Sequence, residues 1–586
     1  MAAAAVLFTI FLAFTGCEQP GGTVNNPAPD SDAALRELTL SAGSLSPAFD
    51  PARTVYSAEV GNSVKAITVT GAANSRYAVV GGQNGKKRNL DVGLNPPIAI
   101  TVTAQDGTEK TYTVTVTRLE KRLIVITSHG DLAKIGVDPD FSLAGEYRLE
   151  TDLVLEHWVP IGGVFSGQFD GNHHTITIRG FAESVFLDKK TCLGVFGSIR
   201  GSADSKALVK DLSVTTEIAE TISRTGVYYV GALTGYAGAY TELDNISVAG
   251  SLRFANTATG RGAGIYSGGV AGGLYGAELR NSRVSADIDA YGTAGNGSYN
   301  YVGGLAGIFE QDTVIDPDAP FGTAVSIGSS IVNCHNTGNV TGRTSGAQSN
   351  VFVGGIAGGS GYSFKTYYSG KIEDCSSTGN ISARCEGGYW AFAGGIAGTI
   401  VGDGDGNPAT GPTRIARSYA TGNVTASTTS GGWPYAGGIV GYNYYGALVS
   451  QCYVTGTVIG EGGYDYTGGI AGYNAVSDGK AAGTVRNCVA LNPSIDAPNG
   501  FDLVYRVIGN GGGTIADNRA YSGMAITVNG TPWSGANPGP NTNDGADCDE
   551  KPPRSVYEAL GWDFDTVWEM GDDGYPILRW TFIVNE

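Results

Sequence analysis

The chain has 586 residues with 91 glycines, and 37 Lys and Arg stand against 55 Asp and Glu for a formal net charge of −18. This length exceeds one compact core, and interior glycine disfavours long helices because each costs about 1 kcal/mol relative to alanine. With 41% hydrophobic residues the chain is too apolar for disorder, and its negative charge argues against nucleic acid as a partner. The composition predicts an all-β protein with many turns.

The first 34 residues predict export. Residues 1–16 (MAAAAVLFTIFLAFTG) form an apolar run too short to span a bilayer, and we interpret them as a signal peptide. The small residues before Cys17 resemble the lipobox of bacterial lipoproteins. That resemblance implies cleavage before Cys17 and lipid attachment to it, although no Lys or Arg precedes the apolar run. A plain secretory signal is the alternative. Residues 17–34, rich in Pro, Gly, Asn and Asp, predict a flexible tether.

Residues 35–118 predict a small β-sandwich. Apolar residues alternate in PIAITVTAQDGTEKTYTVTVTR, as expected of half-buried strands, and Asp106-Gly107 predicts a hairpin turn. The opening LTLSAG and this closing segment resemble the bacterial cadherin-like β-sandwich domain. That resemblance implies a spacer or binding module.

A glycine-rich pentad recurs seven times in the rest of the chain, at intervals of 31 to 51 residues. An aromatic residue stands two positions before the first glycine of each copy: Tyr229, Tyr266, Tyr301, Phe352, Phe392, Tyr435 and Tyr466. An aliphatic residue stands two positions after it: Leu233, Val270, Leu305, Ile356, Ile396, Ile439 and Ile470. In an extended chain these residues share one face, and we therefore expect them to form one buried stripe.

A second motif follows each pentad, for example IVNCHNTGNV at 331–340 and IEDCSSTGNI at 372–381. Two strand-like motifs repeated in order predict a β-helix or solenoid, which we expect to be right-handed and in which each coil buries its apolar stripe against its neighbours. The expected organisation is an entry segment at 119–190, the repeats at 191–530, and a linker with a C-terminal cap at 531–586. The number of coils per repeat stays open.

The pentads with the following N-C-x-x-T-G-N-V resemble the GLUG motif of bacterial surface proteins. The segments 132–178 and 557–580 resemble the usual lead-in and close of such repeats. The resemblance implies a surface-exposed β-helix, and some relatives are adhesins or stand beside immunoglobulin A peptidase domains.

Aromatic residues are the main candidates for ligand binding. The aromatic ladder suits either sugar stacking or a core, and its phase with the aliphatic residues favours the core. Extra aromatic residues in the loops are better candidates, and those we select for glycan or protein binding are Trp390, Trp433, Tyr444, Tyr445 and Tyr464.

Metal and catalytic chemistry find little support in the sequence. Cys334, Cys375, Cys452 and Cys488 occupy one repeat position that Ser418 shares, which predicts a buried column rather than a metal array. The stretch 403–407 (DGDGN) mimics a calcium loop, but Pro408 and Arg414 break the pattern, and we read it as a polar turn. No HExxH, GxSxG or phosphate-binding loop occurs.

We therefore expect a non-catalytic, lipid-anchored protein of the bacterial outer membrane or cell surface, adhesin-like, without cofactor or metal. Its expected partners are the membrane, through lipid at Cys17, and a host, matrix or glycan ligand. The alternatives are a polysaccharide-acting enzyme and a purely structural stalk.

Overall fold

The computed structural model describes residues 28–579, apart from 63, 121, 188–189, 261–262, 294, 296, 316–323, 362–369, 388, 403–411, 430, 476–480, 500–502 and 534. The chain divides into two compact units, and the last boundary between them in the sequence falls between Thr117 and Arg118. Among the described residues, no helix combines the length and the apolar composition that crossing a membrane requires.

The first unit is the expected β-sandwich. One sheet has the order β1 (Leu35–Leu40), β3 (Ala66–Ala73) and β5 (Lys87–Asn89). The other has the order β2 (Val55–Val60), β8 (Glu109–Arg118), β7 (Ile98–Thr103) and β4 (Val79–Gly82), and β6 (Gly93–Leu94) also pairs with β8. Strands β7 and β8 form the predicted antiparallel hairpin, with Gly107 at a φ of 88° in its turn. Ile100, Val102 and Val114 are fully buried between the sheets.

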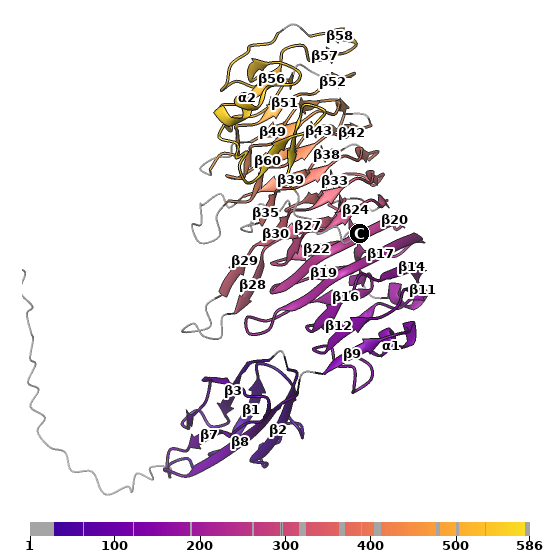
Figure 1. The fold of residues 1–586 in the computed structure, drawn as a ribbon. Helices are drawn as coiled ribbons and strands as arrows, with labels where there is room; N and C mark the ends of the chain where they lie inside the picture. The colour runs from indigo at the N-terminus through magenta and orange to yellow at the C-terminus, as the bar shows by residue number, and fades with distance from the viewer. Residues whose placement is uncertain are drawn as a thin grey trace, which may run out of the picture. The chain divides into compact units, whose positions relative to one another are not determined.

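The second unit is a solenoid built from three parallel sheets (Figure 1). Sheet 1 has nine strands: β15 (Lys190–Leu193), β18 (Val227–Gly231), β21 (Gly264–Gly268), β26 (Tyr299–Gly303), β33 (Asn350–Gly354), β38 (Trp390–Gly394), β43 (Trp433–Gly437), β48 (Tyr466–Gly468) and β53 (Val504–Tyr505). Sheet 2 has ten strands: β12 (Ile161–Phe165), β16 (Phe196–Ile199), β19 (Thr234–Ala237), β22 (Ala271–Tyr275), β27 (Ala306–Glu310), β34 (Ala357–Gly359), β39 (Ala397–Val401), β44 (Val440–Tyr444), β49 (Ala471–Asn474) and β54 (Ile508–Asn510).

Sheet 3 begins at β9 (Leu123–Ile126) and runs the length of the solenoid. Its early strands are long, as in β17 (Ala207–Ile222) and β20 (Thr241–Asn256), which pair in parallel over their whole length. Later coils divide the same path into three short strands, for example β35 (Gly370–Glu373), β36 (Ser376–Ser377) and β37 (Ile381–Cys385).

One repeat forms one coil. The chain passes from β33 in sheet 1 to β34 in sheet 2, crosses sheet 3 in β35, β36 and β37, and returns to sheet 1 in β38. The register matches repeat to repeat, because Gly354 pairs with Gly394 and Ile372 pairs with Ile415. The second half of each pentad therefore begins the strand of sheet 2, and the cysteine-containing motif lies in sheet 3.

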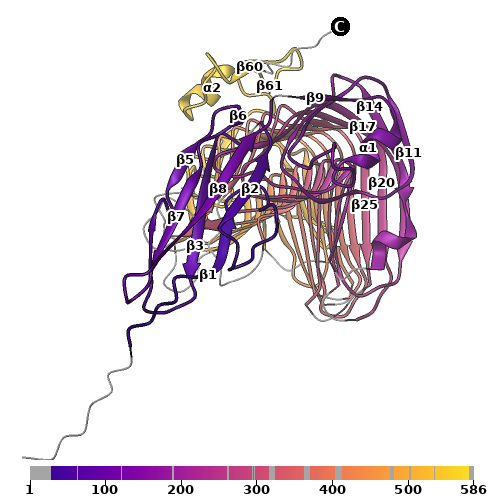
Figure 2. The same cartoon turned by 90° about the horizontal axis from the view of Figure 1, so that it is seen from below.

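The solenoid interior is continuous and apolar. Ile356, Ile396 and Ile439 are fully buried in one hydrophobic cluster that runs from the first coils to the last. Helix α1 (His129–Lys134) lies at the N-terminal end of the solenoid (Figure 2) and contributes Leu132 to this cluster. Ser128 caps the helix by accepting a hydrogen bond from the Asp131 N–H. At the other end, β57 (Ala525–Val528) turns back into β58 (Thr531–Pro532) as an antiparallel pair.

The C-terminal segment covers a flank of the solenoid rather than its end. It contains α2 (Arg554–Ala559) and the antiparallel pair β60 (Trp568–Met570) and β61 (Pro576–Leu578). Its buried aromatic residues pack against Tyr453 and Val489 on the outer face of sheet 3. The Tyr453 hydroxyl donates a hydrogen bond of 2.7 Å to the carbonyl oxygen of Pro576. The cap expected within 531–586 thus closes the side of the last coils.

Candidate functional site

The aromatic ladder is continuous but lies outside the solenoid interior. Its rings stack coil upon coil, with centroid distances of 4.4 Å for Tyr301 and Phe352 and 4.6 Å for Phe352 and Phe392. In β33, Val351 and Val353 belong to the interior cluster, whereas Phe352 points to the opposite face and belongs to a separate aromatic cluster. The expectation that the aromatic and aliphatic residues of a pentad share one face is therefore wrong.

The physical reason is the bend inside each pentad. The chain turns from sheet 1 into sheet 2 between Gly354 and Ala357, so the simple alternation of an extended chain does not continue through it. A Cβ atom on Gly354 would collide with the carbonyl oxygen of Ala357, and one on Gly355 would collide with that of Gly395 in the next coil. Glycine is required at this corner because backbone from two coils meets there.

A second aromatic column from sheet 2 packs against the ladder. Tyr442 and Tyr473 stack at 5.3 Å, and each meets a ring of the ladder edge to face, Tyr435 at 5.3 Å and Tyr466 at 5.2 Å. Five of the seven ladder rings are buried, with Phe392 only 1% exposed, and Tyr266 and Tyr466 are half-buried. The ladder is thus a packed outer layer and not the ligand site.

Three of the five selected aromatic residues come together on the surface. Trp390 and Trp433 occupy paired positions at the start of β38 and β43 and stack at a centroid distance of 6.0 Å. Tyr464 meets Trp433 edge to face at 6.1 Å, and Tyr389 lies 4.5 Å from Trp390. Tyr389, Trp433 and Tyr464 are 40%, 39% and 47% exposed. We call these four residues the aromatic platform.

Tyr389 was missed by the sequence analysis, although its position beside Trp390 signals it. The other two selected residues, Tyr444 and Tyr445, lie at the end of β44 and are not part of the platform. Tyr444 is buried against Val401 and Ala475, and Tyr445 packs on the same cluster. Sequence could not separate the two groups, because the length of each loop between the sheets decides which aromatic residues meet.

A buried acid lies directly beside the platform. Asp465 follows Tyr464 and is fully buried, and only a weak contact with the backbone N–H of Gly462 reaches its carboxylate. The hydroxyls of Thr428 and Thr467 are also buried without partners. Burial, and secondarily the Glu461 carboxylate, raises the pKa of Asp465 to about 7. The corner beside the platform therefore holds a carboxyl group whose pKa lies well above its ordinary value.

The four repeat cysteines form a buried column of free thiols, as expected. Each thiol donates to the carbonyl oxygen two residues earlier, as Cys375 does to Glu373 at 3.1 Å. The Ser418 hydroxyl makes the same bond to Ala416 at 2.9 Å. Thiol and hydroxyl are interchangeable here because both satisfy one carbonyl in a small space.

Within the part of the chain that the structure describes, no group of three or more His, Cys, Asp or Glu side chains is placed to hold a metal ion. Cys17 and the calcium-loop mimic at 403–407 lie outside the described residues.

Comparison with known proteins agrees with the two sequence resemblances. Residues 35–119 match the cadherin-like beta sandwich domain, and residues 434–459 match the GLUG motif. A protein of Evansella cellulosilytica described as a "Putative membrane protein" is 35% identical over 96 residues. The match covers 15% of this chain and 14% of that protein.

Among solved structures, a "putative immunoglobulin A1 protease" from Bacteroides ovatus aligns with 79% of this chain and 94% of its own at 16% identity and a TM-score of 0.32. The domain content of the chain is that of a surface or extracellular protein. The chain carries an N-terminal cadherin-like β-sandwich domain and a parallel β-solenoid that contains the GLUG motif.

Proposed function

We propose that this is a non-catalytic, adhesin-like surface protein that binds an extracellular glycan through the aromatic platform. The platform itself is the observation that carries the proposal. Aromatic faces stack well on the C–H faces of sugar rings, and a contiguous exposed apolar patch marks an interaction site more often than isolated exposed side chains do. The solenoid holds the rings in place because each belongs to, or adjoins, a strand that pairs on both sides.

The platform is tested with glycan and matrix-protein arrays on the full chain. Trp433→Ala removes the central ring, which touches both Trp390 and Tyr464. We expect at least a tenfold loss of affinity, because central aromatic residues contribute roughly 2 kcal/mol or more to an interface. Tyr77→Ala is the matched control, since Tyr77 is 51% exposed but lies in the β-sandwich. Protein binding without glycan binding, or equal loss in both variants, would contradict the proposal.

Two rival functions make different predictions. A polysaccharide-acting enzyme would cleave polymers in a product assay, and the cleavage would depend on a surface carboxylate. A purely structural stalk would bind nothing on the arrays, so Trp433→Ala would have no effect to measure. The absence of HExxH and GxSxG in the sequence favours binding over catalysis.

The proposal includes a lipid anchor at Cys17 in the bacterial outer membrane or cell surface. The supporting feature is the apolar run of residues 1–16 followed by Gly16-Cys17. Mass spectrometry of the mature N-terminus should find a diacylated or triacylated Cys17. A mature N-terminus that is unmodified and begins at another residue would contradict the lipid anchor and indicate a secreted protein.

A further inference from the structure

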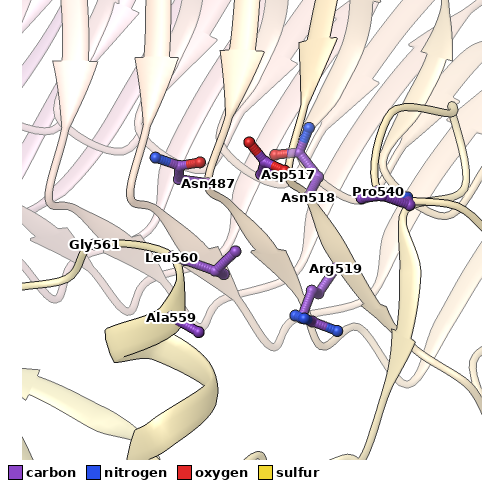
Figure 3. A pocket seen from close by; sticks show the side chains of 8 residues that line it. All are labelled: Asn487, Asp517, Asn518, Arg519, Pro540, Ala559, Leu560 and Gly561. Carbon is purple, nitrogen blue, oxygen red and sulfur yellow. The ribbon is translucent and has the colours of Figure 1, made fainter.

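A polar cleft lies between the last coils of the solenoid and the C-terminal segment (Figure 3). Its volume is about 360 Å³, near the lower end of the range for small-molecule sites. The lining residues come from sheet 3 and its turns, from the loop after β58, and from α2 and the turn behind it: Asn487, Asp517, Asn518, Arg519, Pro540, Ala559, Leu560 and Gly561.

Arg519 is the one cation that lines this cleft. Among the described residues its guanidinium has no carboxylate within 4.0 Å, and its Nε is buried without a hydrogen-bond partner. The nearby Arg506, in contrast, pairs with Asp547 at 2.7 Å. A half-buried cation without a counter-ion favours an anionic ligand, and the fork of Arg suits a carboxylate.

The fold explains why the C-terminal segment does not cover Arg519. Arg519 continues an outward-facing column of sheet 3 in which Tyr419, Tyr453 and Val489 pair in succession. The C-terminal segment covers those three residues with its own apolar side chains. Trp562 reaches only as far as Asn487, where its indole N–H donates to the carbonyl oxygen at 3.0 Å. Arg519 therefore lies at the border of the apolar cover, where the cleft opens.

The remainder of the cleft suits hydroxyl groups and an apolar ring face. Asn487 and Asp517 adopt left-handed backbone conformations, with φ of 55° and 53°, at successive turns of the solenoid. In Figure 3 the Asp517 carboxylate and the Arg519 guanidinium point in opposite directions. Leu560 and Ala559 supply the apolar side.

The amide of Asn518 is fully used within the protein. It accepts a hydrogen bond from the Cys488 N–H at 3.0 Å and donates to the carbonyl oxygen of Val485 at 3.0 Å. Asn518 thus builds the wall of the cleft, and the polar groups left to recognise a ligand are those of Arg519 and Asn487.

We propose that this cleft binds a carboxylate-bearing sugar residue. Arg519 pairs with the carboxylate, the Asn487 amide binds a hydroxyl, and the ring lies against Leu560 and Ala559. The cleft uses none of the residues of the aromatic platform, so this site is independent of the function proposed above.

The test is isothermal titration calorimetry of the full chain with sodium glucuronate. Glucose, which lacks the carboxylate, and sodium acetate, which lacks the hydroxyls, are the comparison ligands. We expect glucuronate to bind at least tenfold more tightly than either. Arg519→Gln should weaken glucuronate binding at least tenfold, and Arg486→Gln should leave it unchanged, because Arg486 is exposed on the neighbouring strand outside the cleft.

A thermal melt confirms that each variant is folded. If Arg519→Gln fails to fold, Arg519→Lys replaces it, because lysine keeps the charge but loses the fork of the guanidinium. Arg519→Lys should weaken glucuronate binding less than Arg519→Gln does. Absence of glucuronate binding, equal affinity for acetate, or unweakened binding by Arg519→Gln or by Arg519→Lys would each overturn the proposal. If Trp433→Ala left glycan binding on the arrays unchanged, the function proposed for the aromatic platform would be contradicted, but the proposal for this cleft would stand.

Discussion

Single residues in left-handed conformations set the turns of sheet 3. In each described coil from residue 245 onward, one such residue directly precedes the repeat position that the four cysteines and Ser418 occupy. These residues are Asn245, Asn281, Asn333, Asp374, Arg417, Gln451, Asn487 and Asp517. Asn and Asp tolerate this conformation best among residues with a side chain. Arg417 and Gln451 are the exceptions, and each is held by a bond, Arg417 to Asp374 and Gln451 to the carbonyl oxygen of Gly561.

The buried acid beside the platform predicts a pH-dependent stability. The folded state keeps the proton of Asp465 to about pH 7, whereas the unfolded chain loses it near its ordinary value of 3.8. Between these values the folded state binds more protons, so the free energy of unfolding should fall as pH rises from about 4 to 7. Asp465→Asn should remove this part of the slope.

The measurement is urea unfolding of both proteins across that pH range, followed by tyrosine and tryptophan fluorescence. Taking the difference between the two proteins isolates Asp465 from Glu310, another acid whose pKa burial raises, to about 8. Parallel slopes for wild type and variant would show that Asp465 is ionised in the folded protein.

At the scale of the elements, glycine limits the distance between coils. Gly338, Gly379, Gly422 and Gly456 form a column in the T-G-N and T-G-T turns, and a Cβ on each would collide with the carbonyl oxygen one coil earlier. None of the four has a positive φ. The requirement is therefore close approach between neighbouring coils and not backbone conformation.

Gly422→Ala should destabilise the solenoid by about 1–3 kcal/mol, the usual cost of overpacking that shifts backbone. Gly162→Ala is the matched control, since nothing lies within 4 Å of its added Cβ and its φ is not positive. Chemical denaturation measures both. Equal stability of the two variants would mean that neighbouring coils can move apart to accept the added Cβ without lowering the free energy of unfolding.

The strands were largely predictable from sequence, but the side of the strand on which each residue of the pentad lies was not. The repeated pentad and the second motif predicted stacked strands because identical residues recur in order, and Gly354 does pair with Gly394. The side of the aromatic ladder was mispredicted because period-two alternation applies only within a strand. A bend of two residues between β33 and β34 reverses the face. The glycines of the pentad allow this bend, but they do not indicate which face each neighbouring side chain takes.

At the scale of the whole solenoid, the C-terminal segment stabilises the last coils from outside. Trp562 is 3% exposed and packs on Trp568 at 4.6 Å and on Tyr557 at 5.0 Å. Sequence indicated a closing segment from its resemblance to the usual end of such repeats. It could not indicate the flank, because contact with Tyr453 and Val489 joins residues some hundred positions apart.

Trp562→Ala should cost about 3–5 kcal/mol and speed amide hydrogen exchange in β46 (Tyr453–Val454) and β51 (Val489–Ala490), which the segment covers. Exchange in β17 and β20 should stay unchanged, because repeat proteins couple mainly to their neighbours. Trp433→Ala, at an exposed tryptophan, is the control and should alter neither region. Uniform acceleration along the chain would indicate a single cooperative unit instead.

The match of one repeat to one coil has a consequence for how such a protein changes over generations. Recombination between two repeats inserts or deletes a complete turn, and the strands on either side of the joint meet in frame. Each event alters the length of the rod by one interstrand spacing, roughly 4.8 Å, and leaves no unpaired edge. Copy number alone then sets how far the terminal cleft stands from the first coil.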